Sequence, residues 1–260
     1  MNKFTYTVSV CAALFFAACG DDSSSATSSS DYSSSNVVKL SSSVIHISSS
    51  AMLVWVNPST VVIDSITDSR DGQSYKTVTI GSQTWMAQNL NYGTADSYCY
   101  NDSTKYCAKY GRLYTWAAAM DSAGTWSTNG KGCGFEKTCS PTNPVRGVCP
   151  TGWHLPKIAE FETLFTVVGG QAVAGTKLKS TSGWNNSGNG TDDYSFSALP
   201  AGDSNYNEDY DGQGHYAVFW SSTEYSSDYA YRMYLEYDID NVGLYYYFKS
   251  NGFSVRCVKD

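Results

Sequence analysis

The sequence predicts a mixed fold of α-helices and antiparallel β-strands, held together by disulfide bonds. Three observations predict it. Apolar and polar residues alternate between positions 73 and 80 and again after position 229, two segments carry apolar residues at helical spacing, and six cysteines lie between positions 99 and 257. A chain of 260 residues has room for one sizeable domain or two small ones.

The N-terminal residues resemble the signal of a bacterial lipoprotein. An apolar run over residues 8–18 follows Lys3; it is too short to span a bilayer and fits a secretory signal. Two alanines stand directly before Cys19, as in the cleavage box of lipoproteins, in which that cysteine receives the lipid. We expect residues 1–18 to be removed and Cys19 to anchor the chain in the outer membrane, exposed at the cell surface. The alternative is ordinary secretion with a free Cys19.

Residues 19–67 predict a tether. Serines dominate from position 23 to 50, and such a composition buries too little apolar surface to offset the entropy lost on ordering. Residues 51–67 are more apolar and either add a strand or extend the tether. The folded domain is expected over residues 68–260.

Elements follow in order along the domain. Alternation over residues 75–80, broken at Gly81, predicts a β-hairpin. Apolar residues at positions 113, 116, 117 and 120 predict a short buried helix. A second helix is predicted from Pro156 to Gly169-Gly170, with Glu160 pointing to water. His154 precedes it, and a lone histidine there favours a structural role.

The C-terminal third predicts antiparallel strands. Residues 229–239 alternate, and residues 244–258 predict two strands joined by a turn at positions 250–252. Within the first of these two strands, Leu244, Tyr246 and Phe248 point one way and Tyr245, Tyr247 and Lys249 the other. If the first set is core, the second is displayed.

Six cysteines remain beyond Cys19, and six cysteines allow fifteen pairings. We favour Cys99 with Cys107 and Cys133 with Cys139, because each pair closes a short polar loop; Cys149 is then left to pair with Cys257. A zinc site is the competing interpretation, but no C-x-x-C motif or paired histidine spacing is present.

Six segments of the chain form a recognisable pattern: "DGQSYKTVTIGSQTWMAQNLN", "GRLYTWAAAM", "CPTGWHLPKIAEFETL", "TDDYSFSALPAG", "FWSSTEYSSDYAYRMYLEY" and "GFSVRCV". Together they resemble the Fibrobacter succinogenes major paralogous domain family. Parts of this pattern are in turn similar to the formylglycine-generating enzyme and C-type lectin folds. The resemblance implies an α+β class: an irregular, disulfide-stapled, C-type-lectin-like module with two short helices on twisted antiparallel strands.

Two departures limit what the resemblance implies about activity. Formylglycine-generating enzymes carry a metal-binding cysteine pair shortly before the closing segment, and no cysteine lies between Phe219 and Phe253. Calcium-dependent lectins carry E-P-N or Q-P-D and W-N-D triplets, which are absent. Neither oxidase chemistry nor the lectin sugar site is therefore expected.

The remaining candidate sites are a calcium loop and a tyrosine face. Asn207, Asp209 and Asp211 alternate before Gly212 like the first half of a calcium loop, but the twelfth position lacks the bidentate glutamate, which favours a solvated turn. The candidate ligand-binding residues are Tyr234, Tyr245 and Tyr247.

We therefore expect a non-catalytic module that recognises a glycan or a protein at the cell envelope. The alternatives are a structural envelope protein and, less favoured, an oxidase-derived enzyme or a hydrolase whose acids would come from Glu160, Glu224 or Glu236. No cofactor other than calcium is expected. A net charge of −7 argues against nucleic acid as a partner.

Overall fold

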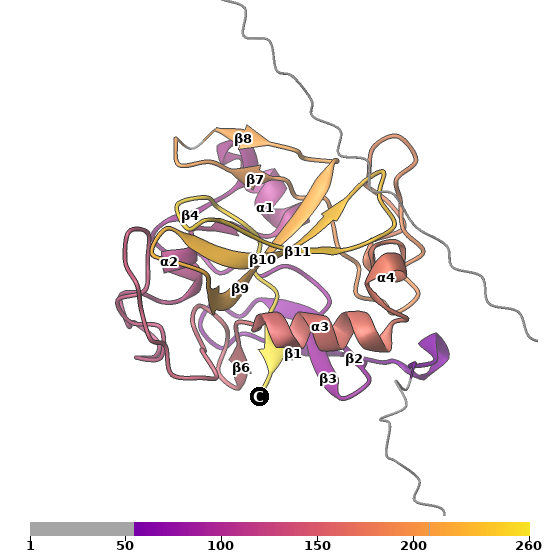
Figure 1. Cartoon of the computed structure of the whole chain (residues 1–260), viewed down its shortest axis with the longest axis horizontal. Helices are drawn as coiled ribbons and strands as arrows, with labels where there is room; N and C mark the ends of the chain where they lie inside the picture. The colour runs from indigo at the N-terminus through magenta and orange to yellow at the C-terminus, as the bar shows by residue number, and fades with distance from the viewer. Residues whose placement is uncertain (1–54, 208) are drawn as a thin grey trace, which may run out of the picture. The chain divides into compact units, whose positions relative to one another are not determined.

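Short helices and antiparallel sheets make up the part of the chain that the computed structural model describes, residues 55–207 and 209–260 (Figure 1). The helices are η1 Pro58–Thr60, η2 Tyr100–Asp102, α1 Thr104–Tyr110, α2 Trp116–Ala119, α3 Ile158–Val167 and α4 Gln171–Leu178. The strands are β1 Val62–Thr67, β2 Ser74–Ile80, β3 Gln83–Met86, β4 Ser97–Tyr98, β5 Leu113–Tyr114, β6 Trp153–His154, β7 Asp203–Ser204, β8 Tyr210–Asp211, β9 Tyr216–Glu224, β10 Tyr229–Glu236, β11 Gly243–Phe248 and β12 Val258–Lys259. Within these ranges, no helix is long and apolar enough to cross a membrane.

The largest sheet has five strands in the order β1-β2-β3-β12-β6. Its β2–β3 hairpin turns at Gly81, which has a φ of 63°, and places Val78 opposite Trp85, as the alternation predicts. Strand β1 pairs with β2 along its whole length. Of the two alternatives for residues 51–67, the structure therefore has the added strand, and the ordered domain begins before position 68.

The predicted hairpin between residues 244 and 258 is wrong. Strand β11 pairs with β10, and Val258 of β12 instead lies between Trp85 and His154. The segment that connects them makes isolated bridges, Phe253 with Tyr114 and Ser254 with Phe219. The turn residues therefore carry the chain from one sheet to the other. The local sequence instead predicts a hairpin, in which the second strand pairs with the first.

The second sheet, of order β11-β10-β9, separates two apolar cores. Side chains on one face, such as Phe219 and Met233, pack with Trp85 and with the buried face of α3. Side chains on the opposite face, such as Trp220 and Ala230, pack with Trp116 and with the Cys149–Cys257 bridge. Both faces of the central strand are therefore covered over most of its length.

The helices differ in number from the prediction, with four α-helices in the described residues where two were expected. Helix α3 has the predicted buried face, with Phe161, Leu164 and Phe165, and the chain leaves it at Gly169, which has a φ of 109°. The helix expected over residues 113–120 is shorter, because Thr115 caps α2 and the two residues before it form β5. Helices α1 and α4 carry little helical periodicity and were not predicted.

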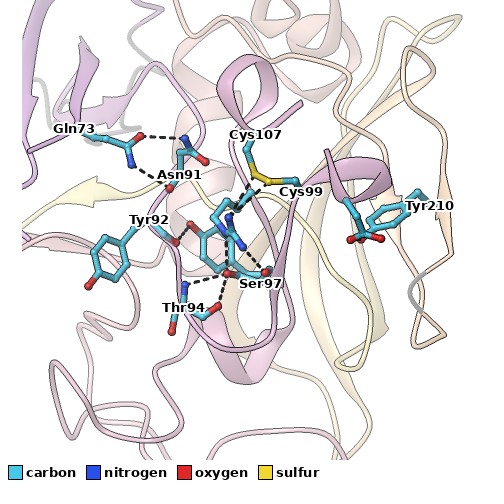
Figure 2. The surroundings of a disulfide bond; sticks show 11 residues. Gln73, Asn91, Tyr92, Thr94, Ser97, Cys99, Cys107 and Tyr210 are labelled. Carbon is cyan, nitrogen blue, oxygen red and sulfur yellow. Dashed lines mark hydrogen bonds between the residues drawn. A yellow bond between two sulfur atoms is a disulfide. The ribbon is translucent and has the colours of Figure 1, made fainter. Parts of the chain in front are cut away.

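All three predicted disulfides are present: Cys99–Cys107, Cys133–Cys139 and Cys149–Cys257. The third bridge joins positions 108 residues apart and ties the segment before β6 to the residue before β12. Figure 2 shows the first bridge, between Cys99 and Cys107, with Ser97 nearby. Arg112 donates to Ser97 and to the two sulfur atoms. Of the segments that the bridges close, only residues 133–139 contain no helix and no strand, so this short loop is held mainly by its disulfide.

Candidate functional site

Exposed aromatic side chains gather on strand β11 and the loops near it. We call this set the aromatic surface: Phe135, Tyr206, Tyr225, Tyr245, Tyr246, Tyr247 and Phe248. Strand β11 is the edge strand of its sheet, so its outer side has no neighbouring strand in the described residues. Consecutive residues of a strand point to opposite faces, and here consecutive rings are exposed on both faces.

The first face of β11 carries two of the three predicted ligand-binding tyrosines. Tyr245 is 56% exposed and Tyr247 is 40% exposed. The third, Tyr234, is half-buried and packs against the second core, with its ring 6.4 Å from that of Tyr245. The structure therefore places Tyr234 on the neighbouring strand beside Tyr245, and both Tyr234 and Tyr247 lie close to the guanidinium of Arg232.

The opposite face of β11 differs from the prediction. With Tyr245 and Tyr247 exposed, Tyr246 and Phe248 were expected to lie in the core. Tyr246 is 45% exposed and Phe248 is 42% exposed, and only Leu244 of this set packs against the first core. The Tyr246 ring instead stacks on that of Tyr225, with centroids 3.8 Å apart. Strand β11 thus extends beyond the apolar core, which covers only the Leu244 end of this face.

Lys249 also departs from the prediction, since it is buried and not displayed. Its Nζ donates hydrogen bonds to the backbone oxygens of Lys137 and Ser227, each at 2.9 Å, and to Glu224 Oε1. The Nζ also lies 4.5 Å from the centre of the Trp116 ring. This side chain therefore fixes the end of β11 to the Cys133–Cys139 loop.

An apolar hollow of about 460 Å³ lies at the same end of β11, lined by Phe135, Tyr206, Phe248 and Ser250. Its three rings come from the Cys133–Cys139 loop, the β7–β8 turn and the last position of β11. Apolar hollows with a polar rim are common binding sites for small molecules and chain ends. The hollow extends the aromatic surface beyond the strand.

Arg232 lies at the centre of the first face, opposite Tyr245 in the β10–β11 register. Its guanidinium carbon is 4.7 Å from the ring centre of Tyr234, 5.0 Å from that of Tyr247 and 5.4 Å from that of Phe253. Burial lowers the pKa of Arg232 because the charged form loses hydration. The aromatic faces replace part of that hydration through cation–π attraction.

Asp203 and Tyr216 border this cluster. Burial raises the pKa of Asp203 to about 6, against the opposing effects of a hydrogen bond from Tyr216 and the charge of Arg232. Burial also raises the pKa of Tyr216, and the negative charges of Asp203 and Asp211 add to that rise. The first face therefore combines flat rings, a cation and a carboxyl group.

The predicted calcium ligands lie in the β7–β8 turn, where they have local hydrogen-bond roles. The Oδ1 atom of Asn205 accepts hydrogen bonds from the backbone nitrogens of Asn207 and Asp209, and Asp211 sits in β8 opposite Asp203. Among residues 55–207 and 209–260, no group of three or more His, Cys, Asp or Glu side chains is placed to hold a metal ion. Calcium binding by this turn stays a prediction.

Two of the three acids named for hydrolysis bind basic side chains. Glu224 accepts from Lys249 and from the Cys139 backbone nitrogen. Glu160 does not point to water: its Oε1 is 2.8 Å from His154 Nε2, and its Oε2 accepts from the Lys157 backbone nitrogen at the start of α3. Both carboxylates thus have structural roles, because they bind side chains and backbone groups of other segments.

His154 is bound on both sides, with Nδ1 2.7 Å from Asp260 Oδ1. Burial alone lowers the pKa of His154, but the hydrogen bonds and charges of Glu160 and Asp260 outweigh it and raise the pKa above 6.5. A raised pKa in the folded state means that this interaction stabilises fully below 6.5 and is lost as the pH rises through the folded value.

We expect the thermal midpoint to fall as the pH rises from 6 to 9, and the substitution His154→Gln to flatten that dependence. Thermal unfolding followed by circular dichroism at each pH measures both. His215 is the matched control, because its partner is the amide of Asn185, which does not titrate. An unchanged pH profile in His154→Gln, or a flattened one in His215→Gln, would contradict the assignment.

Residues 78–259 match the Fibrobacter succinogenes major domain. The chain belongs to this family. No curated protein and no solved structure is found to match it. The part of this Fibrobacter succinogenes major domain protein that matches the family begins within β2, and strand β1 lies before the matched part.

Sequence reasoning missed several residues of the site in this family member. They are Phe135, Tyr206, Tyr225, Arg232, Tyr246 and Phe248. A usable signal for β11 was present, since four consecutive aromatic residues leave no polar face to point to water. The predicted signal peptide, tether and lipid site at Cys19 lie largely outside the described residues and stay predictions.

Proposed function

We propose that the domain is a non-catalytic recognition module that binds a polysaccharide at the aromatic surface, carried on a chain anchored to the outer membrane through Cys19. The observation that carries this proposal is the exposure of consecutive aromatic rings on both faces of β11. Large exposed apolar patches are uncommon on soluble proteins unless they bind something. Tyrosine suits such a patch because it offers a flat apolar area together with a hydroxyl group.

A polysaccharide fits the geometry better than a compact ligand. Pyranose rings present flat C–H faces that pack against aromatic rings, while their hydroxyl groups need donors and acceptors at the sides. Tyr245 and Tyr247 are two positions apart on one strand, so their attachment points are about 7 Å apart. Rings repeated along a strand suit a ligand that is itself a repeating chain.

The proposal includes a C-type-lectin-like ancestry for the fold, supported by the disulfide that ties the segment before β6 to the last strand and by the irregular loops. It places the ligand away from the site that calcium-dependent lectins use, because their triplets are absent from this sequence. Recognition without catalysis is supported by the roles of Glu160 and Glu224, whose carboxylates bind His154 and Lys249.

Replacing Tyr245 and Tyr247 together with alanine is expected to weaken polysaccharide binding at least about tenfold, equivalent to about 1.4 kcal/mol. A panel of soluble plant and bacterial polysaccharides, tested by affinity electrophoresis and then by calorimetry, measures the binding. The thermal midpoint should stay within a few degrees, because both side chains are largely exposed.

Trp55→Ala is the matched control, because Trp55 is 53% exposed and lies outside the aromatic surface. It should leave the affinity unchanged. If the wild-type chain binds no polysaccharide in the panel, or if Trp55→Ala weakens binding as much as the double substitution does, the proposed function is wrong.

A further inference from the structure

Arg232 is the one arginine of the described residues that lacks a hydrogen-bond partner. The other four each donate to carboxylate, hydroxyl, amide or carbonyl oxygens: Arg70 to Asp68, Arg112 to Ser97, Arg146 to Cys149 and Trp126, and Arg256 to Asn89, Phe196 and Ser197. For Arg232, the Nε atom is buried with no partner, and none of the ion pairs within residues 55–207 and 209–260 includes it.

A buried guanidinium without hydrogen-bond partners lowers the stability of the folded protein. Five N–H groups point in a fixed plane and lose hydration on burial, and each unmade hydrogen bond of a buried charged group is unfavourable. The rings of Tyr234, Tyr247 and Phe253 offset part of that cost through their faces, yet a ring face accepts no directed hydrogen bond from the terminal nitrogens. The N–H groups of the Arg232 guanidinium therefore remain available to donate hydrogen bonds to a ligand at the surface.

The positive charge of Arg232 is also not neutralised by an ion pair. Asp203 is the carboxyl group that acts on it most nearly, but no ion pair joins the two. The hydroxyl group of Tyr216 donates to Asp203 instead. Half-buried Arg232 therefore presents positive charge between exposed tyrosines of the aromatic surface, in a protein that is acidic overall.

We propose that Arg232 makes the aromatic surface selective for a carboxylated polysaccharide, with the guanidinium binding the carboxylate of a uronic acid residue beside the rings of Tyr245 and Tyr247. A carboxylate matches the planar fork of a guanidinium with two parallel N–H···O bonds, which a lysine ammonium cannot reproduce. The neighbouring rings supply the flat contact that a sugar needs and a free small anion does not. This inference rests on the proposed function and names its ligand class.

The test compares a uronic acid polymer with its uncharged ester, which has the same backbone, and adds a second uronic acid polymer and a neutral polymer. The purified full-length chain is titrated with polygalacturonate, with its fully methyl-esterified form, with alginate and with a neutral β-glucan. We expect polygalacturonate or alginate to bind at least about tenfold more tightly than the esterified or neutral polymers. Arg232→Lys and Arg232→Met should each remove that preference, whereas Lys131→Gln, which removes a positive charge at an exposed position elsewhere, should keep it.

The thermal midpoint of Arg232→Met separates recognition from a structural role. Methionine fills similar space, and no acceptor loses a hydrogen bond from Arg232, so the midpoint should shift by no more than about 2–4 °C. A much larger decrease would show that the cation–π contacts are structural and would overturn the inference.

The binding outcomes are distinguishable as well. Equal affinity for esterified and free polygalacturonate, together with loss on Tyr245→Ala/Tyr247→Ala, overturns the carboxylate inference and leaves the proposed function standing. Binding to none of the four polymers or the wider polysaccharide panel overturns both. Tighter binding to poly-L-glutamate than to either uronic acid polymer overturns the assignment to a polysaccharide.

Discussion

Replacing both Cys149 and Cys257 with alanine is expected to lower the free energy of unfolding by about 4–5 kcal/mol. The bridge closes a loop between positions 108 residues apart, and the entropy that a crosslink removes from the unfolded chain grows with loop length. Both cysteines are fully buried in the second core. Urea unfolding of the oxidised wild type and of the double variant measures the difference.

The matched control is the double alanine variant of Cys99 and Cys107, whose bridge spans only 8 positions and should contribute about 2–3 kcal/mol. The order of the two losses is the critical result. A larger loss for the short loop than for the long one would contradict the assignment of the Cys149–Cys257 bridge as the main staple of the fold.

Substituting Arg256 with methionine is expected to lower the free energy of unfolding by about 3–5 kcal/mol. Arg256 is completely buried, and burial lowers its pKa to about 9. Its guanidinium donates to Asn89 Oδ1 at 2.8 Å, to the Ser197 oxygen at 2.8 Å and to the Phe196 oxygen. Methionine fills the space but leaves these acceptors without donors.

Arg232→Met provides the matched control for this substitution, because the same change there leaves no acceptor without a donor. Thermal unfolding should show a decrease on the order of 10 °C for Arg256→Met and little change for Arg232→Met. Similar decreases in the two variants would mean that hydrogen bonds to the guanidinium contribute little in this domain.

Local patterns predicted the elements whose partners are near in sequence. Alternation around Gly81 predicted the β2–β3 hairpin, and apolar spacing up to Gly169 predicted α3, because both patterns record one buried face. The cysteine pairings were also predictable, since two of the three bridges close short loops. Alternation along β11 predicted the exposure of Tyr245 and Tyr247, but its condition that Tyr246 and Phe248 are core is wrong.

Elements that depend on distant partners could not be predicted. Helix α4 contains Gly175, whose missing side chain allows close approach to the Asn241 oxygen, and its Gln171 binds the Val242 oxygen. These contacts stabilise a helix that its own sequence disfavours. Likewise, the two residues of β12 are too few to show any periodicity, and their position is set by β3 and β6.

The site was only partly predictable for a related reason. The register of β9 and β10 shifts between Ala230 and Arg232, and such an irregularity changes which side chains share a face. Nothing in the local sequence indicates that the Arg232 guanidinium lies among rings from β11 and from the segment before β12. The exposure of Tyr246 depends on where the first core ends, which is a property of the packed domain.

The position of β12 within the five-stranded sheet constrains when this protein can fold during its synthesis. A ribosome releases the N-terminus first, and β3 and β6 emerge more than a hundred residues before the strand that joins them. Until the last residues appear, the two strands lack the neighbour that links them, and Cys149 lacks its partner. The five-stranded sheet and the Cys149–Cys257 bridge can therefore form only after residues 257–259 have been synthesised.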